Sequence, residues 1–267
     1  MPLRTAHTRD RVTDIRLALP DLVALVPNLA LVTANIHPAH EALIEGPDEI
    51  ILSKRRMLPI RAGDLDLALG PGSFIQTNAA VAGDLYRQAA DWAALPLASG
   101  DAPQTLWDLY CGVGGFALAA ARAGFPRVTG VEVSSGAISS AISAARHAGL
   151  SRSAVSFIAD DATAWARAQA PEDVPDVIVV NPPRRGIGTD LAAYLDECDA
   201  PRVIYSSCNP TSLAKDLAAM PTLRPVEGRL FDMFPHTTHA EVALLLERAE
   251  VAPIARPTPA SDRYNWT

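Results

Sequence analysis

Two short apolar segments of the chain each end in residues that could bind a ligand or react with one. Residues 176–180 lead into Asn181-Pro-Pro-Arg-Arg, and residues 203–207 lead into Cys208. The carboxyl ends of neighbouring parallel strands meet at the edge of an open α/β sheet where ligands bind. A helix predicted to begin near Asn209 would stabilise a thiolate at Cys208. We therefore predict a nucleophilic cysteine beside a ligand site, against the alternative that Cys208 only fills space at a strand end.

A glycine-rich turn indicates what the ligand is. The turn Asp108-Leu-Tyr-Cys-Gly-Val-Gly-Gly-Phe lies between a predicted strand and a predicted helix, and glycine lets backbone approach a ligand closely. Glu132 ends the next predicted strand, where a carboxylate can accept hydrogen bonds from both ribose hydroxyls, although it could also be an ordinary strand-end acid. The dinucleotide fingerprint requires glycine where this chain has Ala117, and Asp108 suits a ligand with a cationic amino acid end. The pattern favours S-adenosylmethionine over NAD.

Two further segments contain acidic residues with competing interpretations. Asp161 follows the third predicted strand, where it could bind an adenine amine or, like its neighbour Asp160, cap the next helix. His236, His239 and Glu241 precede an apolar strand and could form a metal site. No further ligand lies nearby in the sequence, so we predict no metal and favour general-base chemistry by Glu241.

Strand and helix patterns alternate from residue 105 onward, which predicts an α/β fold with a parallel sheet and right-handed crossovers. Predicted strands cover residues 106–110, 127–133, 155–158, 177–180 and 203–206, and predicted helices cover residues 116–123, 137–149, 162–168, 189–197 and 212–220. Thr189 or Asp190 is expected to cap the fourth of these helices. Two extended runs, 224–234 and 240–247, close the series. A closing hairpin after five strand–helix units predicts a seven-stranded, Rossmann-like methyltransferase sheet.

The residues before the sheet predict a small N-terminal α+β region. Residues 29–36 and 49–52 are typical of strands, and the alternation in residues 60–69 predicts one half-buried strand. Residues 78–95 predict a helix that leads into the sheet. The first 15 residues show no periodicity. We expect three parts, which are a partial N-terminal or central α+β region with its linking helix (1–100), a class I methyltransferase domain (101–249) and an irregular C-terminal tail (250–267).

Composition limits the classes of protein. The chain has 267 residues and a net charge of −7, which argues against a long nucleic-acid-binding track. Lys54-Arg55-Arg56 and Arg184-Arg185 could still form a local basic patch, and the first cluster could equally be solvated surface. No run approaches the roughly 18 apolar residues of a membrane span, and the N-terminus lacks a signal peptide. Three cysteines without metal-type or disulfide spacing predict a cytoplasmic protein.

Four motifs in this order resemble those of the RNA 5-methyluridine methyltransferases, which are S-adenosylmethionine-dependent enzymes of class I. The motifs are Asp108-Leu-Tyr-Cys-Gly-Val-Gly-Gly-Phe, Asn181-Pro-Pro-Arg-Arg-Gly, Tyr205-Ser-Ser-Cys-Asn and Phe231-Asp-Met-Phe-Pro-His-Thr-Thr-His-Ala-Glu-Val. Ser73-Phe-Ile-Gln-Thr-Asn is similar to a segment that precedes the sheet in this family. The likeness runs from about residue 16 to residue 248, and it is strongest to the branch that modifies bacterial 23S ribosomal RNA.

The resemblance implies a role for each matching residue. Cys208 matches the nucleophile, which adds to carbon 6 of uracil, and Glu241 matches the base, which removes the proton from carbon 5. Residues that match positions holding S-adenosylmethionine are Gln76, Tyr110, Glu132 and Asn181, with Asp161 in the comparable acidic position. The implied partner is RNA, specifically 23S ribosomal RNA, with no membrane partner, and we expect a monomer. Phe74, Phe231 and Phe234 are candidates for base stacking, although each is expected in the core.

The chain also departs from the family pattern. Members of this branch begin with a stretch whose cysteines bind an iron–sulfur cluster, and such a cluster needs about four thiolates. The three scattered cysteines here cannot build one, so we expect no iron–sulfur cluster and a shortened homologue. Two alternatives stay open, which are a non-catalytic RNA- or cofactor-binding remnant and a base N-methyltransferase. The second would have an aromatic residue after Asn181-Pro-Pro, where this chain has Arg184.

Overall fold

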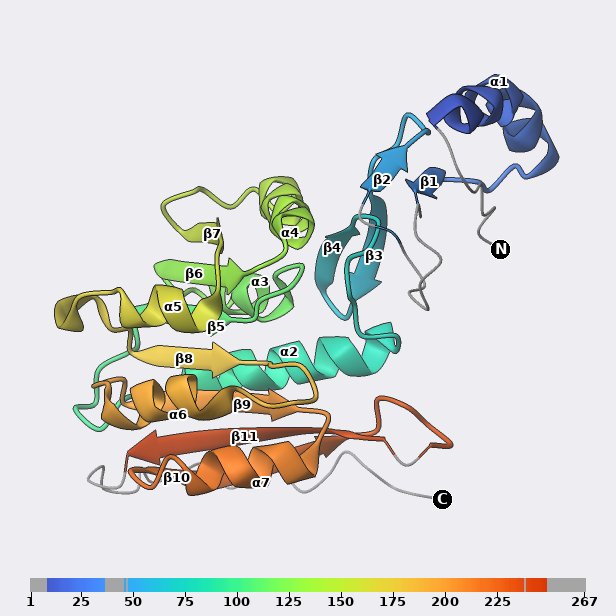
Figure 1. Ribbon diagram of the computed structural model, residues 1–267. Helices are drawn as coiled ribbons and strands as arrows, with labels where there is room; N and C mark the ends of the chain where they lie inside the picture. The colour runs from blue at the N-terminus through green and yellow to red at the C-terminus, as the bar shows by residue number, and fades with distance from the viewer. Residues whose placement is uncertain (1–8, 37–45, 47, 238, 249–267) are drawn as a thin grey trace, which may run out of the picture.

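A seven-stranded sheet forms the centre of the protein in a computed structural model that describes residues 9–36, 46, 48–237 and 239–248. The strand order is β10-β11-β9-β8-β5-β6-β7 (Figure 1). The strands are β5 (Thr105–Leu109), β6 (Arg127–Glu132), β7 (Val155–Ala159), β8 (Val177–Val180), β9 (Arg202–Ser207), β10 (Leu223–Phe231) and β11 (Glu241–Arg248). Neighbours pair in parallel except β11, which is antiparallel to both β9 and β10. The predicted α/β class and the seven-stranded sheet are confirmed.

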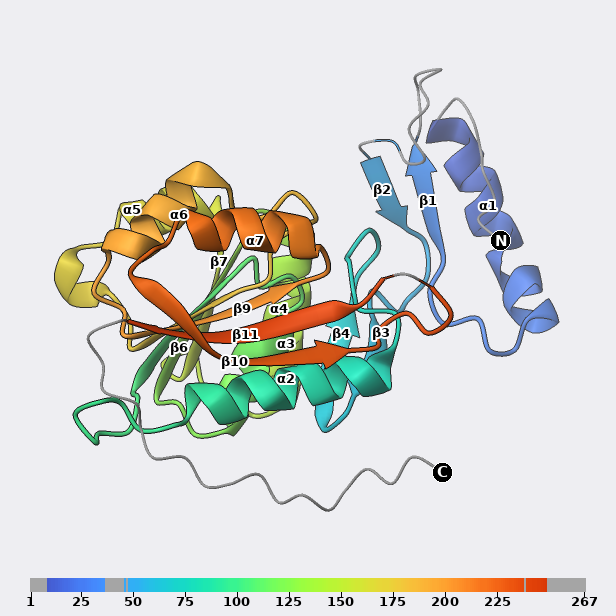
Figure 2. The same ribbon diagram turned by 90° about the horizontal axis from the view of Figure 1, so that it is seen from below.

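Helices cover both faces of the sheet (Figure 2). On one face α2 (Ala79–Ala93), α3 (Gly115–Arg122) and α4 (Ser135–His147) pack into one hydrophobic core. On the other face α5 (Ala162–Arg167), α6 (Gly188–Glu197) and α7 (Pro210–Ala218) form a second core, and the short helix η1 (Pro171–Asp173) precedes β8. Because β8 is buried along its whole length, its sequence is a continuous apolar run, as expected for a central parallel strand.

The N-terminal region differs from its prediction in two elements. Residues 60–69 are not one strand, because β3 (Leu58–Ala62) and β4 (Leu65–Leu69) form a hairpin that turns at Gly63, whose φ is 57°. Apolar residues alternate within each of the two strands, and the phase of the alternation changes at the turn. A helix, α1 (Arg9–Leu25), occupies a segment without a predicted element, and it precedes the two-stranded sheet of β1 (Thr33–Ile36) and β2 (Asp48–Ile51).

Most other boundaries lie within two residues of their predictions, but the predicted cap of α6 is wrong. The helix begins one residue earlier, at Gly188, so Ile187 occupies the N-cap position and makes no side-chain cap bond. Neither Thr189 nor Asp190 can cap a helix that already contains it. The predicted irregular tail, residues 250–267, lies outside the described residues. No helix in the described part of the chain is long and apolar enough to span a membrane.

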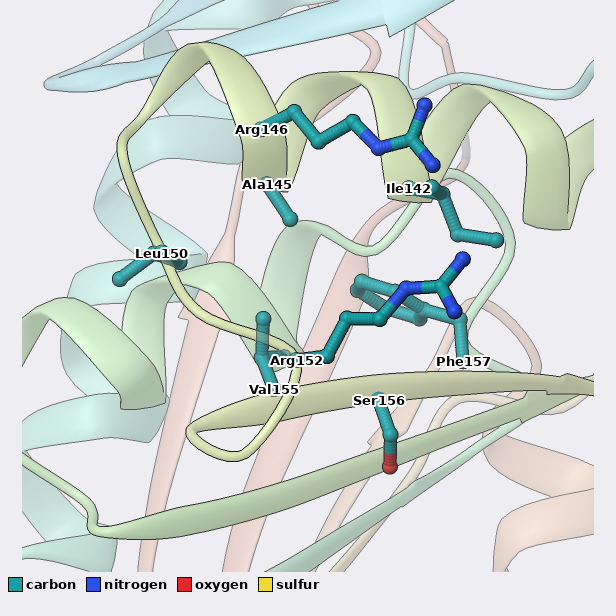
Figure 3. Close-up of a pocket in the computed structure, with 8 residues that line it drawn as sticks. All are labelled: Ile142, Ala145, Arg146, Leu150, Arg152, Val155, Ser156 and Phe157. Atoms are coloured by element: carbon teal, nitrogen blue, oxygen red, sulfur yellow. The ribbon is translucent and has the colours of Figure 1, made fainter.

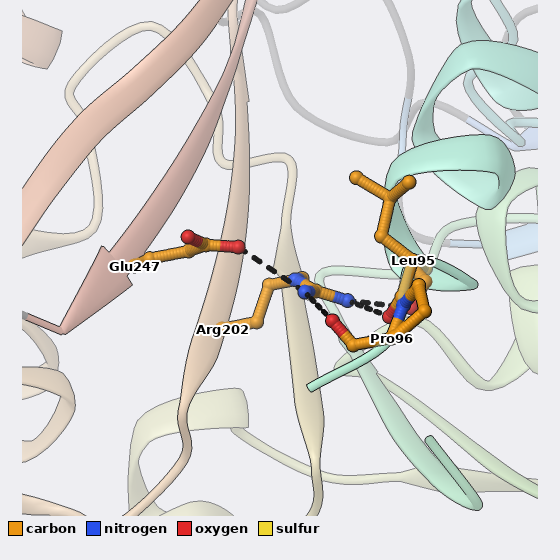
Figure 4. A network of polar contacts seen from close by, with 5 residues as sticks. Leu95, Pro96, Arg202 and Glu247 are labelled. Carbon is orange, nitrogen blue, oxygen red and sulfur yellow. Dashed lines mark hydrogen bonds and ion pairs between the residues drawn. The ribbon is translucent and has the colours of Figure 1, made fainter. Parts of the chain in front are cut away.

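A buried ion pair joins α2 to the sheet at the edge opposite the cavity described below. The Arg202 guanidinium lies 3.1 Å from a Glu247 carboxylate oxygen, and the two side chains are 2% and 7% exposed. Arg202 also donates hydrogen bonds to the carbonyl oxygens of Ala93, the last residue of α2, and of Leu95 and Pro96, which follow the helix (Figure 4). The guanidinium therefore supplies donors to carbonyls that a helix end leaves without intrahelical partners.

Candidate active site

A cavity of about 610 Å³ opens where the parallel strands reach their carboxyl ends. This size lies within the range of about 300–1,000 Å³ that is typical of ligand sites. The structure brings together at this cavity all the residues selected from the sequence, which are Gln76, Tyr110, Glu132, Asp161, Asn181, Cys208 and Glu241. They come from the carboxyl ends of five parallel strands, from the start of β11 and from the segment before α2, so only the folded sheet can assemble them.

A second cavity, of about 210 Å³, lies between α4 and β7 (Figure 3). Its lining is apolar apart from Arg146, Arg152 and Ser156, and it contains no cysteine and no carboxylate. It shares no lining residue with the larger cavity. Because it holds neither a nucleophile nor a base, we assign the chemistry to the larger cavity.

The glycine turn between β5 and α3 forms one wall of the larger cavity. Tyr110 has a φ of 64°, an uncommon left-handed conformation for a residue with a Cβ, and Gly114 has a φ of 87°. Glu132, from the neighbouring β6, accepts hydrogen bonds from the backbone N–H groups of Gly112 at 3.3 Å and Ser134 at 2.9 Å. The Glu132 carboxylate is therefore held at the rim of the turn, where a ribose would meet it.

Asp108 lies behind this turn and does not line the cavity. Its side chain is fully buried, and its Oδ2 accepts a hydrogen bond from the Ala117 N–H at 2.9 Å, while Oδ1 has no partner within the described residues. Burial raises the pKa of Asp108 to about 8, with the nearby Glu132 charge adding to this effect. The expectation that Asp108 meets a cationic ligand directly is therefore not supported. Asp108 instead anchors the start of α3.

Asp161 caps the helix, as one interpretation predicts, and it lies on the cavity wall, as the other requires. Its Oδ1 accepts a hydrogen bond from the Ala164 N–H at 2.9 Å and so caps α5, and the residue also lines the cavity. Asp160 is different, because its carboxylate bonds the backbone N–H of Asp161 and the residue is not among those that line the cavity.

Cys208 is half-buried at the end of β9, on the cavity wall. Its neighbours fix the backbone around it. The Ser207 Oγ accepts the Asn209 N–H at 3.1 Å, and the Asn209 side-chain amide donates to the Arg184 carbonyl oxygen at 2.9 Å. Asn209 also caps α7, which begins at Pro210. The thiol thus lies next to a helix N-terminus, and the adjacent residue Asn209 connects this strand end to the loop that follows Asn181.

The other two cysteines are less suited to reaction. Cys111 is buried, and burial raises its pKa well above the usual value for a thiol, with Asp108 and Glu132 adding to the shift. Burial also raises the pKa of Cys198, which ends α6 outside the cavity. A thiol with a raised pKa holds little of the reactive thiolate.

Glu241 enters the cavity because β11 runs opposite to its neighbours. The first residue of an antiparallel strand lies at the same edge as the last residues of β9, and Val242 pairs with Ser207. The Glu241 carboxylate is 1% exposed, and its Oε1 accepts a hydrogen bond from the Ser206 Oγ at 2.5 Å. Its Oε2 has no hydrogen-bond partner among the described residues. Burial raises the pKa of Glu241, and the Ser206 hydroxyl opposes that rise.

The helix α7 holds the loop after Asn181 in place through Asp216. The buried Asp216 carboxylate accepts hydrogen bonds from the Ile187 N–H at 2.9 Å and the Tyr205 hydroxyl at 2.6 Å. A Cβ at Gly186 would lie 2.3 Å from an Asp216 oxygen, so only glycine fits beside the carboxylate. These bonds hold in place the loop that places Arg184 and Arg185 on the cavity wall.

The histidines near Glu241 do not form a metal site. Within residues 9–36, 46, 48–237 and 239–248, no group of three His, Cys, Asp or Glu side chains could hold a metal ion. The His239 ring instead lies edge-on to Phe234, with their centroids 6.3 Å apart.

Comparison with known proteins places the chain in a family. The family model described as tRNA (uracil-5-)-methyltransferase matches residues 51–169 and 172–249. The chain belongs to this family. A relative from Halothiobacillus neapolitanus, "23S rRNA (uracil(747)-C(5))-methyltransferase RlmC", is 46% identical over 89% of this chain and 61% of its own length. A Shigella sonnei relative of the same name is 46% identical over 90% of this chain and 61% of its own length. The chain spans about three-fifths of the length of these curated relatives.

A solved structure of the same family shares the fold. The Pyrococcus abyssi tRNA (uracil-54, C5)-methyltransferase, in complex with S-adenosyl-L-homocysteine, superimposes with a TM-score of 0.69 at 25% identity, covering 84% of this chain and 52% of that one. The family assignment and the methyltransferase fold predicted from the motifs are thus confirmed.

Several cavity residues were not predicted from the sequence. Tyr86, from α2, lines the cavity and packs edge-on against Phe116 with centroids 4.9 Å apart. Nothing in the helical pattern around Tyr86 distinguishes it from a core residue. Phe74 lines the cavity with 71% of its surface exposed, so the expectation that it lies in the core is wrong, whereas Phe231 is buried as expected. Exposed aromatic residues beside a motif cannot be told from buried ones without the fold.

Proposed function

We propose that this chain transfers a methyl group from S-adenosylmethionine to carbon 5 of a uridine in RNA, through a covalent adduct with Cys208. One observation carries the proposal. A half-buried thiol shares a single cavity with a buried carboxylate, one oxygen of which has no hydrogen-bond partner among the described residues, in a member of the uracil-5-methyltransferase family. The relatives at 46% identity are named for uracil 747 of 23S ribosomal RNA, so we propose 23S ribosomal RNA as the substrate.

The cavity fits the methyl donor. Glu132 offers carboxylate oxygens to ribose hydroxyls, and the backbone at Gly112, where an added Cβ would meet nothing within 4 Å, leaves room for close approach of a ligand. Gln76, Tyr110, Asp161 and Asn181 complete the set that we propose to hold it, and all of them line the cavity. When bound, S-adenosylmethionine supplies an electrophilic methyl group on a sulfonium centre.

Cys208 and Glu241 perform the steps that the uracil ring requires. Carbon 5 of uracil is a poor nucleophile until the Cys208 thiolate adds to carbon 6, which moves the electrons of the double bond toward carbon 5. After carbon 5 is methylated, Glu241 accepts the proton from carbon 5. The electrons of that C–H bond then restore the ring double bond and expel the Cys208 thiolate.

RNA binding is proposed to be local to the cavity mouth. A uridine must leave its stack for a thiol in a cavity to reach it. Arg184 and Arg185 are exposed on the cavity wall and can bind phosphates, and the exposed Phe74 ring can stack on a base. With a net charge of −7, the rest of the surface contributes little attraction to RNA.

The test is to incubate the chain with a uridine-containing RNA hairpin and S-adenosylmethionine, and to identify the modified nucleoside by mass spectrometry. We expect 5-methyluridine. An N-methylated base would show a base N-methyltransferase, and no methylation would show a non-catalytic remnant; either result overturns the proposal.

Three variants test the roles of Cys208 in adding to carbon 6 and of Glu241 in removing the carbon 5 proton. Cys208→Ser should form no adduct and no product while binding S-adenosylmethionine as the unmodified chain does. Cys198→Ser is the matched control, because Cys198 ends α6 outside the cavity, and it should leave turnover unchanged. Glu241→Gln should accumulate a protein–RNA adduct that survives denaturing electrophoresis, since the carbon 5 proton has no acceptor. Normal release of product by Glu241→Gln would refute the role of the base.

A further inference from the structure

The Glu241 carboxylate is held asymmetrically. One oxygen, Oε1, accepts the Ser206 hydroxyl at 2.5 Å, and the other, Oε2, has no hydrogen-bond partner among the described residues. Both residues are almost fully buried, at 0% for Ser206 and 1% for Glu241. Burying a carboxylate oxygen without a hydrogen-bond partner costs free energy. An oxygen of this kind at a cavity wall therefore indicates a functional role. Oε2 is the oxygen that is available to take a proton.

Ser206 occupies the position on β9 from which it can reach this carboxylate. It pairs with Ala243 across the β9–β11 ladder, two residues from Glu241, and so lies on the same edge of the sheet. A carboxylate that is ionised can only accept hydrogen bonds, so the hydroxyl is the donor. The adjacent Ser207 bonds the backbone of Asn209, whereas the Ser206 hydroxyl, within the part of the chain that the structure describes, bonds only the Glu241 carboxylate.

We propose that Ser206 is a positioning residue for the base, and that its hydroxyl fixes Oε1 so that Oε2 is left to receive the carbon 5 proton. The inference deepens the proposed function and rests on it. The hydroxyl has a second effect through the same bond. A donor to a carboxylate stabilises the charged form, so Ser206 lowers the pKa that burial raises.

Loss of the Ser206 hydroxyl should therefore slow the removal of the carbon 5 proton and leave the earlier steps unchanged. Addition of Cys208 to carbon 6 and methylation of carbon 5 do not involve Glu241. Without Ser206, the Glu241 pKa rises further and the freed carboxyl can rotate, so fewer molecules can accept the carbon 5 proton at neutral pH. The methylated adduct should then accumulate, and a higher pH should restore its release.

Other titratable groups share this cavity and must be held constant in the test. Tyr86 from α2 interacts electrostatically with Glu241, and its pKa lies far above neutrality because of burial. The remaining titratable or charged groups on the cavity wall are Tyr110 and Cys111 after β5, Glu132 on β6, Asp161 before α5, Arg184 and Arg185 after β8, and Cys208 after β9. None of these is altered by a substitution at position 206.

The experiment compares Ser206→Ala with the unmodified chain in the RNA assay across pH, at saturating RNA and S-adenosylmethionine. A hydrogen bond to a charged group corresponds to about one to two pH units, so the acid limb of the rate profile should move upward by that amount. At a pH below both limbs, turnover should fall by about 10- to 100-fold, and it should recover above the new limb. The fraction of protein trapped as RNA adduct should rise at neutral pH.

Two further variants isolate the hydrogen bond from general damage. Ser140→Ala removes another fully buried, hydrogen-bonded serine, on α4 and away from the cavity, and should leave the pH profile unchanged. Ser206→Thr keeps a hydroxyl and should restore the acid limb. Thermal unfolding of each variant establishes that it is folded.

A measurement without RNA keeps the inference separate from the proposed function. The infrared carbonyl band of protonated Glu241, assigned by its absence in Glu241→Gln, should titrate at higher pH in Ser206→Ala. If the unmodified chain fails to methylate RNA but this titration shifts, the proposed function fails and the hydrogen bond's effect stands. An unshifted titration overturns the inference, and so does a loss of turnover by the same factor at every pH without build-up of adduct.

Discussion

The buried pair of Arg202 and Glu247 allows a stability prediction with a magnitude. Replacing Arg202 by Met removes the donor to three carbonyl oxygens at the end of α2 and leaves the Glu247 carboxylate buried without its cation. Breaking a buried ion pair by removing one partner costs about 3–5 kcal/mol. For a domain of this size each kcal/mol lowers the melting temperature by about 2–4 °C, so the expected fall is roughly 6–20 °C.

The assay is thermal unfolding followed by circular dichroism. The matched control is Arg224→Met, because Arg224 is exposed on β10 and a surface substitution changes stability by about 0.5 kcal/mol or less. The double variant Arg202→Met, Glu247→Met should recover part of the loss, since no unpaired charge remains in the core. A melting temperature for Arg202→Met equal to that of the control would refute the view that this pair joins α2 to the sheet.

Three further predictions concern the glycine turn and the thiols. Gly115→Ala should destabilise the chain to urea by about 1–3 kcal/mol, because the added Cβ would lie 2.4 Å from the Tyr86 ring; an unchanged urea midpoint would refute this contact. Burial raises the Asp108 pKa from 3.8 to about 8, so the folded chain keeps a proton that the unfolded chain releases. The free energy of unfolding should therefore fall as pH rises from about 4 to about 8, and Asp108→Asn should flatten this part of the urea-derived profile; a slope that persists in the variant would contradict the assignment. Iodoacetamide should modify Cys208 before Cys111, as peptide mass spectrometry can show, because Cys111 is buried with a raised pKa; labelling in the reverse order would exclude Cys208 as the accessible thiol.

The parallel part of the sheet could be predicted because its strands are short apolar runs that end at turns. β8 illustrates this, since all four of its residues are buried and apolar and the prediction matched its bounds. The prediction of one strand for residues 60–69 rests on the alternation of apolar residues alone, and it misses the β3–β4 hairpin although Gly63-Asp64 is a typical two-residue hairpin turn. The helix α1 carries only a weak amphipathic pattern and contains Pro20, so its sequence lacks the usual marks of a helix.

The motif residues of the candidate site could be predicted from the sequence, but the contacts that they make could not. The motif residues do line one cavity, because strand ends in a parallel sheet converge whatever the details of packing. The hydrogen bond from Ser206 to Glu241 depends on the register between β9 and β11, which no local sequence pattern specifies. The same holds for Asp108, whose acidic side chain indicates exposure until the fold shows it buried behind α3.

The reversed direction of β11 also constrains how the protein can change. In a wholly parallel sheet the chemistry is confined to loops that follow strands, and such loops tolerate insertions and deletions. Glu241 is instead a ladder residue, paired with Phe231 on β10. Adding or deleting one residue within β11 would turn each later side chain to the opposite face, so side chains that now fill one core would point into the other. The length of β11 is therefore constrained at its first position by Glu241 on the cavity wall and at its later positions by the two cores.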